Sequence, residues 1–165
     1  MHDSQQVIDL IPRLRRYARA LVGERAPADD LVQDTLERAW RKFHLYRPGT
    51  DLRAWLFTVM HNVYVNQVRA MRESTTIDDL ELEATGALPG DGLEIRDLDR
   101  AMRSLPLEQR EVLLLVALEE LSYDEAARAL GVPIGTVMSR LSRARERLRG
   151  LMSGIPQSAR LQVVK

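Results

Sequence analysis

The chain has 165 residues, with 24 Lys/Arg, 24 Asp/Glu and a formal net charge of zero. A composition of 45% hydrophobic and 29% charged residues is typical of a globular protein and excludes a disordered or fibrous one. There is no cysteine, which excludes disulfides and thiolate metal sites. No apolar run reaches the roughly 18 residues that span a bilayer, and Asp3, Gln5 and Asp9 interrupt any signal-peptide pattern. We therefore expect a cytoplasmic protein without membrane insertion.

The zero net charge is an average over unlike segments. Residues 1–72 carry 12 basic and 8 acidic residues, whereas residues 73–101 carry 2 basic and 9 acidic ones. Residues 102–165 carry 10 basic and 7 acidic residues. Two basic segments flank an acidic one, so a nucleic-acid partner stays compatible with the composition.

Three stretches of the N-terminal half show the apolar spacing of amphipathic helices. The first contains Ile8, Leu14 and Leu21 and ends near Gly23. A second follows Pro27, with Leu31 to Phe43, Trp40 included, as its inward side; a third covers about Leu52–Arg72, after a turn at Tyr46–Asp51. No stretch alternates with period two, so the pattern predicts a helical domain over residues 1–72.

The acidic segment, residues 73–94, contains threonines, a proline and glycines but no apolar period, and it predicts a flexible linker. Helical spacing returns at residues 95–152, where "LEQREVLLLVALEEL" predicts one strongly apolar helix. Residues 153–165 are expected to be a tail. The predicted fold class is all-α, with two small helical domains joined by a flexible acidic linker. How the two domains pack in the free protein stays open at this point.

A corner motif lies in the second domain. Ser122 and Glu125 have the spacing of a capping box, Gly131 suits a left-handed C-terminal cap, and Pro133 suits the first turn of a following helix. Two short helices joined by a glycine-containing turn predict a helix-turn-helix.

The second helix of this motif has separate apolar and polar faces. Val137, Leu141 and Ala144 form one stripe, and Ser139, Ser142 and Arg143 lie opposite it with further arginines on both flanks. In a DNA-bound helix-turn-helix this helix enters the major groove, where arginine and serine contact base edges and phosphates. An arginine-rich face is also typical of any solvated helix, so the DNA prediction depends on the corner motif more than on the charge.

Three stretches carry a family resemblance: "DDLVQDTLERAW" (29–40), "PGTDLRAWLFTVMHNVYVNQVR" (48–69), and "LPLEQREVLLL" (105–115) with the corner motif. Between Leu14 and Leu151 the chain resembles a bacterial RNA polymerase sigma factor of the sigma-70 family, extracytoplasmic function (ECF) subfamily. The wording of "PGTDLRAWLFT" and "REVLLLVALEELSYDEAA" looks most like the general-stress branch. The resemblance implies a region 2 helical bundle at residues 1–72 and a region 4 helix-turn-helix at 95–152.

The resemblance also implies a function and partners. The protein would bind the β′ clamp and β subunits of core RNA polymerase and direct promoter-specific initiation, without being an enzyme and without cofactor or metal. The polymerase-binding residues would be Asp30, Gln33, Asp34, Glu37 and Arg38, while Leu31, Leu36 and Trp40 anchor the helix inward. Ordinary surface salt bridges are the alternative for these polar residues. An anti-sigma factor is a further expected partner.

Promoter contacts follow from the same resemblance. The third helix and its preceding turn would read the melted −10 element, with an extruded base held near Arg47–Asp51. The −10 candidates are Arg47, Thr50, Asp51, Thr58, His61, Asn62, Val65 and Arg69. Tyr46, Phe57 and Tyr64 suit either base stacking or core packing.

The helix-turn-helix would read the −35 element as duplex. The −35 candidates are Thr136, Met138, Ser139, Arg140, Ser142, Arg143 and Arg147. Met138 stands where many relatives carry Lys or Arg, and Ser142 replaces a residue that is often larger. Loss of one good base contact weakens binding by about 1–3 kcal/mol, so the sequence and the affinity of the −35 contacts stay open at this point.

Two alternative functions stay open. One is a helix-turn-helix regulator that binds DNA without polymerase; the other is a sigma mimic that sequesters an anti-sigma factor and never contacts a promoter. An enzyme is disfavoured because His2, His44 and His61 lack metal-ligand spacing and there is no glycine-rich phosphate loop.

Overall fold

The structure, a computed structural model, describes residues 2–74 and 93–153, and all the regular elements in these two ranges are helical. The helices are α1 (His2–Val22), α2 (Arg25–Arg41), η1 (Phe43–Leu45), α3 (Leu52–Ser74), α4 (Leu93–Ser104), α5 (Leu107–Leu113), η3 (Leu114–Leu118), α6 (Tyr123–Leu130) and α7 (Ile134–Ser153). The prediction of an all-α fold is confirmed. Nearly all of the predicted linker and tail lies outside the described residues.

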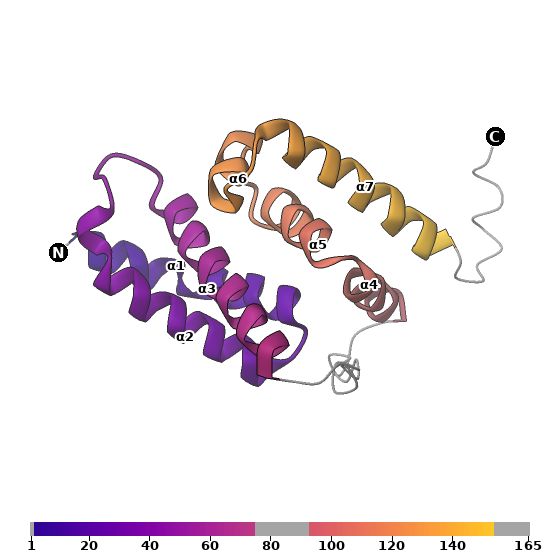
Figure 1. Cartoon of the computed structure of the whole chain (residues 1–165), viewed down its shortest axis with the longest axis horizontal. Helices are drawn as coiled ribbons and strands as arrows, with labels where there is room; N and C mark the ends of the chain where they lie inside the picture. The colour runs from indigo at the N-terminus through magenta and orange to yellow at the C-terminus, as the bar shows by residue number, and fades with distance from the viewer. Residues whose placement is uncertain (1, 75–92, 154–165) are drawn as a thin grey trace.

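The first lobe, α1–α3, is a three-helix bundle (Figure 1). Leu14, Leu31 and Leu56 are fully buried in its centre. Gly23, with φ of +87°, makes the turn from α1 to α2, a conformation that favours glycine.

Trp40 does not anchor α2 inward, so this prediction was wrong. Its side chain is 66% exposed, because the stripe that α2 buries runs through Leu31, Thr35 and Ala39 and Trp40 lies about 100° further round the helix. Ile8 on α1 is 55% exposed for the same kind of reason, although Val7 beside it is buried.

The second lobe contains the predicted corner. Ser122 Oγ accepts from the backbone N–H of Glu125 at 3.1 Å, and the Glu125 carboxylate accepts from the Ser122 N–H at 2.9 Å. Gly131 closes α6 in the left-handed conformation, with φ of +67°. Val137 and Leu141 of α7 are buried against the lobe. The helix-turn-helix prediction is therefore confirmed.

The apolar stretch before the corner is not one regular helix. After Leu113 the backbone widens into the π-helical turn η3, where the N–H of Glu119 donates to Leu114 O at 3.0 Å. Glu120 then takes a left-handed φ of +58°. The widened turn buries Glu119 against the first lobe, and π turns are frequent at functional positions.

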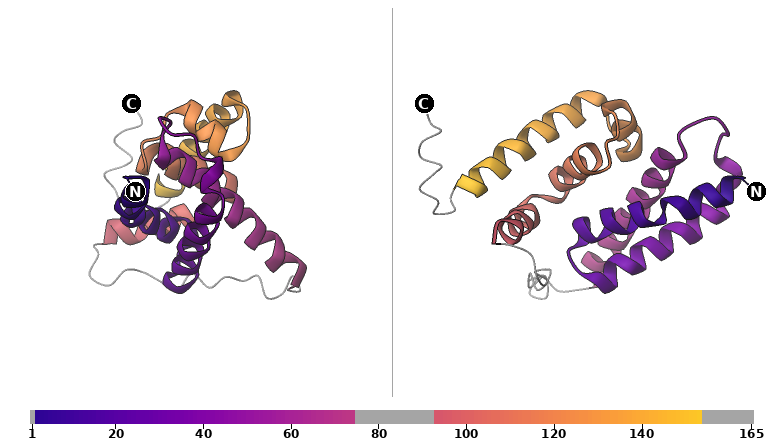
Figure 2. Two further views of the ribbon diagram at one scale, coloured as in Figure 1. Left: turned by 90° about the vertical axis from the view of Figure 1, so that its left-hand side faces the viewer. Right: turned by 180° about the vertical axis from the view of Figure 1, so that it is seen from behind.

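The two lobes pack against each other, with α3 beside α6 (Figures 1 and 2). The π-helical turn η3 contacts α1. The buried apolar residues of both lobes form a single continuous cluster. Arg110 Nη1 donates to Leu21 O at 2.9 Å, and Arg103 Nη2 donates to Gly23 O at 3.0 Å. These arginines satisfy carbonyls at the C-terminal end of α1, where positive charge is favoured. Burial lowers the pKa of Arg110.

Within the described ranges, no helix combines the length and the apolar character that crossing a bilayer requires.

Candidate nucleic-acid and polymerase interfaces

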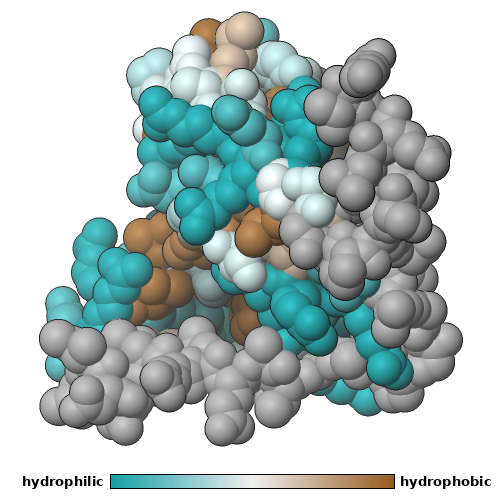
Figure 3. Space-filling model, turned by 90° about the vertical axis from the view of Figure 1, so that its right-hand side faces the viewer, coloured by the Kyte–Doolittle hydropathy of each residue, from teal (hydrophilic) through white to brown (hydrophobic). Residues whose placement is uncertain are grey.

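The recognition helix α7 presents its predicted −35 face to solvent. Ser139, Ser142, Arg143 and Arg147 are exposed, as the helical wheel predicts, because the opposite stripe is buried. In the space-filling view, hydrophilic side chains form a band across the upper half of the molecule, below neutral and hydrophobic ones at its top (Figure 3). The helix therefore offers hydroxyl and guanidinium groups on a convex, wet surface, as groove reading requires.

Two other predicted −35 residues are only partly exposed and make contacts within the second lobe. Arg140 is half-buried, and its Nη2 lies 3.9 Å from Glu108 Oε2 of α5. Thr136 is also half-buried, and its carbonyl accepts from Ser139 Oγ at 3.1 Å. Both therefore serve the lobe's own structure in addition to any DNA contact.

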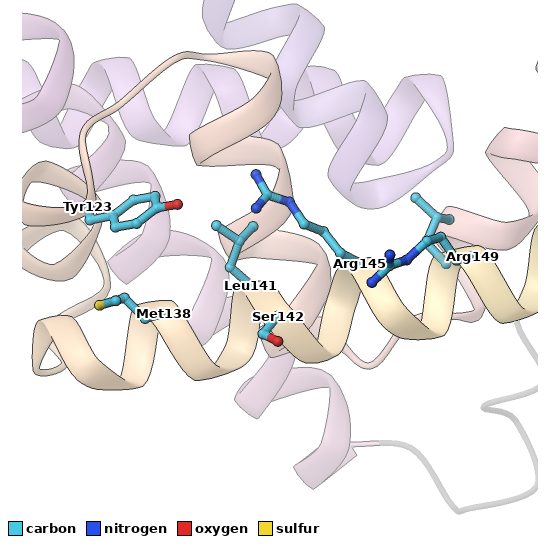
Figure 4. A pocket seen from close by; sticks show the side chains of 7 residues that line it. Tyr123, Met138, Leu141, Ser142, Arg145 and Arg149 are labelled. Atoms are coloured by element: carbon cyan, nitrogen blue, oxygen red, sulfur yellow. The ribbon is translucent and has the colours of Figure 1, made fainter.

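A shallow groove runs beside the recognition face, between α6 and α7. It brings Tyr123 together with Met138, Ser142 and the flanking Arg145 and Arg149 (Figure 4). Met138 is 52% exposed at this groove, so it adds apolar rather than ionic character where a cation would meet a phosphate.

A second groove, between α2 and α3, collects four of the predicted −10 residues: His61, Asn62, Val65 and Arg69. Arg38 of α2 and Lys42, the residue that follows this helix, line the other side, and Asn66 completes it. Amide and imidazole groups flanked by three cations suit an unpaired base with its phosphates. Arg38, a predicted polymerase-binding residue, lines this α2–α3 groove together with the predicted −10 residues. It also lines the adjoining hollow with Asp34 and Glu37.

The turn that would hold an extruded base is built on aromatic rings. Tyr46 donates from its hydroxyl to Thr50 O at 2.7 Å, and its ring centroid lies 5.5 Å from those of Phe43 and Trp55. Thr50 Oγ1 donates to Arg47 O at 2.7 Å. Arg47, Thr50 and Asp51 are all exposed on this braced turn.

Asp51 is connected to both lobes. Its Oδ1 accepts from the backbone N–H of Arg53 at 3.0 Å at the start of α3. Partial burial alone would raise the pKa of Asp51, but hydrogen bonding with Glu125 of α6, the charge of Arg53 and two backbone amides outweigh it and lower the pKa. The turn and the helix-turn-helix are therefore neighbours in space.

His61 differs from the other −10 candidates. Its Nδ1 lies 2.5 Å from Oε2 of Glu111, a buried carboxylate of the second lobe. Thr58 likewise turns inward, donating to Ala54 O at 2.9 Å. Asn62 and Arg69 remain exposed. The side chains of His61 and Thr58, two of the predicted −10 residues on α3, thus already have hydrogen-bond partners within the protein.

The three candidate stacking aromatics belong mainly to the core. Phe57 is fully buried in edge contact with Tyr17, at a centroid distance of 5.0 Å, and Tyr46 is buried too. Tyr64 is half-buried. None of the three offers a free ring face comparable with that of Trp40.

The predicted polymerase face of α2 is exposed and polar. Asp30, Gln33, Asp34 and Glu37 all reach solvent. Asp34 accepts from Gln67 Nε2 of α3 at 2.7 Å, and Glu37 pairs with Arg41 one turn on. Beside them the exposed Trp40 and Ile8 edge an apolar hollow between α1 and α2. The face therefore joins carboxylates and amides to a large apolar ring, as protein interfaces do.

Four residues that line these grooves were not among the predicted site residues: Trp40, Lys42, Asn66 and Tyr123. A finer helical wheel would have found Trp40 and Asn66, since both lie outside the buried stripes of their helices. Lys42 and Tyr123 join their grooves only through the packing of two helices, so no local pattern indicates them. Among the described residues, no group of three or more His, Asp or Glu residues is placed to hold a metal ion.

A two-lobed helical protein with a helix-turn-helix, a cationic α2–α3 groove and an exposed mixed face on α2 belongs to the class of DNA-binding transcription proteins. Residues 7–61 match the family model of the Sigma2 domain of PhyR, and residues 95–148 match sigma-70, region 4. The chain is 38% identical to the ECF RNA polymerase sigma factor EcfG of Rhodopseudomonas palustris over 149 residues, covering 88% of this chain and 82% of that protein. The chain belongs to the ECF RNA polymerase sigma factor family.

Solved structures agree with this assignment. The sigma factor RpoE of Bartonella quintana, solved in complex with the anti-sigma factor NepR, superposes with a TM-score of 0.81 at 36% identity, covering 94% of this chain and 99% of that one. CnrH in complex with the cytosolic domain of CnrY gives a TM-score of 0.67 at 28% identity, with coverages of 92% and 88%.

Proposed function

We propose that this ECF sigma factor carries core RNA polymerase to promoters by three separate surfaces. The α2 face, Asp30 to Glu37 with Trp40, docks on the β′ clamp; the α2–α3 groove holds the melted −10 strand; and α7 reads the −35 duplex. The chemistry of RNA synthesis stays with the polymerase, and the protein acts in the cytoplasm, where that enzyme works. The domain limits of residues 1–72 and 95–152 are part of the same proposal.

The observation that carries the proposal is the α2–α3 groove. Asn62 offers an amide that can hydrogen-bond a base edge, while Arg38, Lys42 and Arg69 surround it with positive charge. A groove of this kind suits single-stranded DNA better than duplex, because its polar groups converge on one narrow track. The −35 helix, by contrast, is convex and free on one side, which suits a duplex groove.

Tethering to polymerase explains how two lobes that each make few DNA contacts can bind a promoter. Each lobe is small and offers few base-reading groups, and Met138 removes a cation from the −35 face. Once polymerase holds both lobes, binding of the second promoter element is effectively intramolecular, which raises the affinity without new contacts. A contact between region 4 and the β subunit belongs to this arrangement.

A transcription experiment tests the proposal. Bacterial core RNA polymerase is mixed with the protein and a library of templates with randomised −35 and −10 elements, and the transcripts are sequenced. We expect Arg143→Ala to relax selection at one −35 position and Asn62→Ala to relax it at one −10 position, each by about 1–3 kcal/mol. Glu146→Ala, an exposed neighbour on α7, is the control. Unchanged selection in both variants would reject the residue assignments.

A sigma mimic is the second candidate, since residues 7–61 match a PhyR domain and one neighbouring structure is of the anti-anti-sigma factor PhyR complexed with the anti-sigma factor NepR. The retained Asn62, Arg69 and Arg143 favour the sigma factor instead, because a mimic has no use for base-reading groups. A mimic yields no transcript from any template of the library. Either function is compatible with an anti-sigma partner, which we propose by analogy with the neighbouring complexes.

A further inference from the structure

The seam between the lobes contains two buried carboxylates of the second lobe, Glu111 and Glu119. Glu119 accepts from Arg16 Nη2 of α1 at 3.0 Å and 3.2 Å, and its backbone carbonyl accepts from Arg53 Nη1 of α3 at 3.1 Å. Glu111 holds His61 of α3. A carboxylate withdrawn this far from water is tolerated only when it is paired, so both depend on the first lobe.

The partners on the first lobe are residues with another expected use. His61 lies in the −10 groove with Asn62 and Arg69, and Arg53 follows the turn that ends at Asp51. The surface of α3 that packs on α6 is therefore next to the surface that would take the promoter strand. In this packed arrangement the imidazole of His61 is engaged by Glu111.

With its lobes packed together, the protein is also too small to reach both promoter elements at once. By their numbering the −10 and −35 elements are about 25 base pairs apart, or about 85 Å of B-form DNA at 3.4 Å per pair. A compact body of this size has a radius of gyration of only about 15 Å. The chain between Ser74 and Leu93 can extend to about 60 Å, so the lobes can separate far enough to reach both elements.

Resting on the proposed function, we propose that the Glu111 and Glu119 contacts form an autoinhibitory latch: they hold the free chain closed, and promoter binding requires them to open. The seam contains apolar contacts as well as these ionic ones. The ionic contacts suit reversible opening, because the carboxylates, arginines and imidazole regain water when the lobes part, which offsets much of the lost attraction. Arg16 is already 51% exposed, so one side of the latch is in contact with solvent.

The π-helical turn η3 places the Glu119 carboxylate of the latch in the seam. Because the backbone is π-helical at Leu114–Leu118, Glu119 points into the seam, while the next residue, Glu120, is exposed with a left-handed φ. Two adjacent glutamates thus differ in burial but not in charge. They provide a matched pair of variants.

The test measures the separation of the lobes and the activity in the same full-length chain. The protein has no cysteine, so Asp29→Cys on α2 and Glu146→Cys on α7, both exposed, accept a spin-label pair without background. We expect Glu119→Gln and Glu111→Gln to lengthen the label distance, and Glu120→Gln to leave it unchanged. Since apparent affinity scales with the open fraction, each of the two latch variants should also lower the concentration for half-maximal transcription by threefold or more.

Two results would overturn the latch: an unchanged label distance in both variants, or a longer distance without any gain in transcription. Should a buried substitution prevent folding, Arg16→Gln breaks the same pair from the solvent side and must give the same two changes. If no template of the promoter library is transcribed even with the wild-type chain, the proposed function has failed, and the label distances alone then decide whether the latch exists.

Discussion

Single residues decide how the helix-turn-helix is closed at each end. The Ser122 hydroxyl and the Glu125 carboxylate satisfy two amides at the start of α6, and Gly131 takes a backbone conformation that other residues adopt only with strain. The corner holds its angle because both ends of a helix of 8 residues are capped. A helix this short would not be stable by propensity alone.

Removing the cap should therefore destabilise the protein. We expect Ser122→Ala to lower the free energy of unfolding by about 1 kcal/mol, because one amide of α6 loses its acceptor. Urea denaturation followed by circular dichroism measures this. Ser104→Ala, which removes only a hydroxyl bonded within α4, should change the value by a few tenths at most. Equal losses in the two variants would contradict a capping role.

Arg110 acts as a connector between the lobes. Its guanidinium donates to the carbonyls of Met102, Leu105 and Arg103 in its own lobe and to Leu21 O of α1, at 2.8–3.0 Å. Such fan-shaped donation needs the planar fork of arginine, which an ammonium group does not have.

We expect Arg110→Lys to lower the free energy of unfolding by about 2 kcal/mol, since at least two carbonyls lose a charged donor while the net charge is unchanged. Arg128→Lys, at an exposed arginine of α6, is the matched control. If the two variants unfold at the same urea concentration, the fork does not contribute as described.

Among the elements, α2 presents three different faces. One stripe is buried in the bundle, one polar edge faces α3, and the remaining face carries Gln33, Glu37 and the exposed Trp40. Large exposed aromatic rings beside polar groups are typical binding hot spots, so this face is the strongest candidate for the polymerase contact.

We expect Trp40→Ala to weaken binding to bacterial core RNA polymerase about 30-fold, the equivalent of about 2 kcal/mol, while the melting temperature changes little. The reason is that the ring is mostly in solvent before binding. Competition against a labelled sigma factor measures the affinity. Ile134→Ala, an exposed apolar residue at the start of α7, serves as the control. A large fall in melting temperature would show that Trp40 has a structural role instead.

At the scale of the whole molecule, the shared core makes one unit of the two lobes. Apolar residues from α1–α3 and from α5–α7 are continuous, and hydrogen bonds from Arg16, Arg53, Arg103 and Arg110 cross the seam. The first lobe contains both tryptophans, Trp40 and Trp55, so their fluorescence reports on that lobe alone.

We therefore expect coincident urea transitions from tryptophan fluorescence and from far-ultraviolet circular dichroism, which reports on all helices. Coupled lobes lose their structure together, because each buries surface against the other. A dichroism transition that continues after the fluorescence change is complete would mean that the second lobe unfolds independently. In the Glu119→Gln variant, which weakens the seam, the fluorescence and dichroism transitions should move apart.

The sequence by itself determined the helices, the corner at Ser122–Pro133, the exposed arginine face of α7 and the separation of charge along the chain. These features depend on residues within about four positions of each other, where periodicity, capping and backbone preference act directly. Only the tertiary structure decided that Trp40 faces solvent, that Arg38 and Lys42 line the α2–α3 groove, and that Glu111 and Glu119 engage His61 and Arg16. The last two contacts join residues 50 and 103 positions apart, and they exist only because the lobes pack together. No local pattern contains the free energy of that packing.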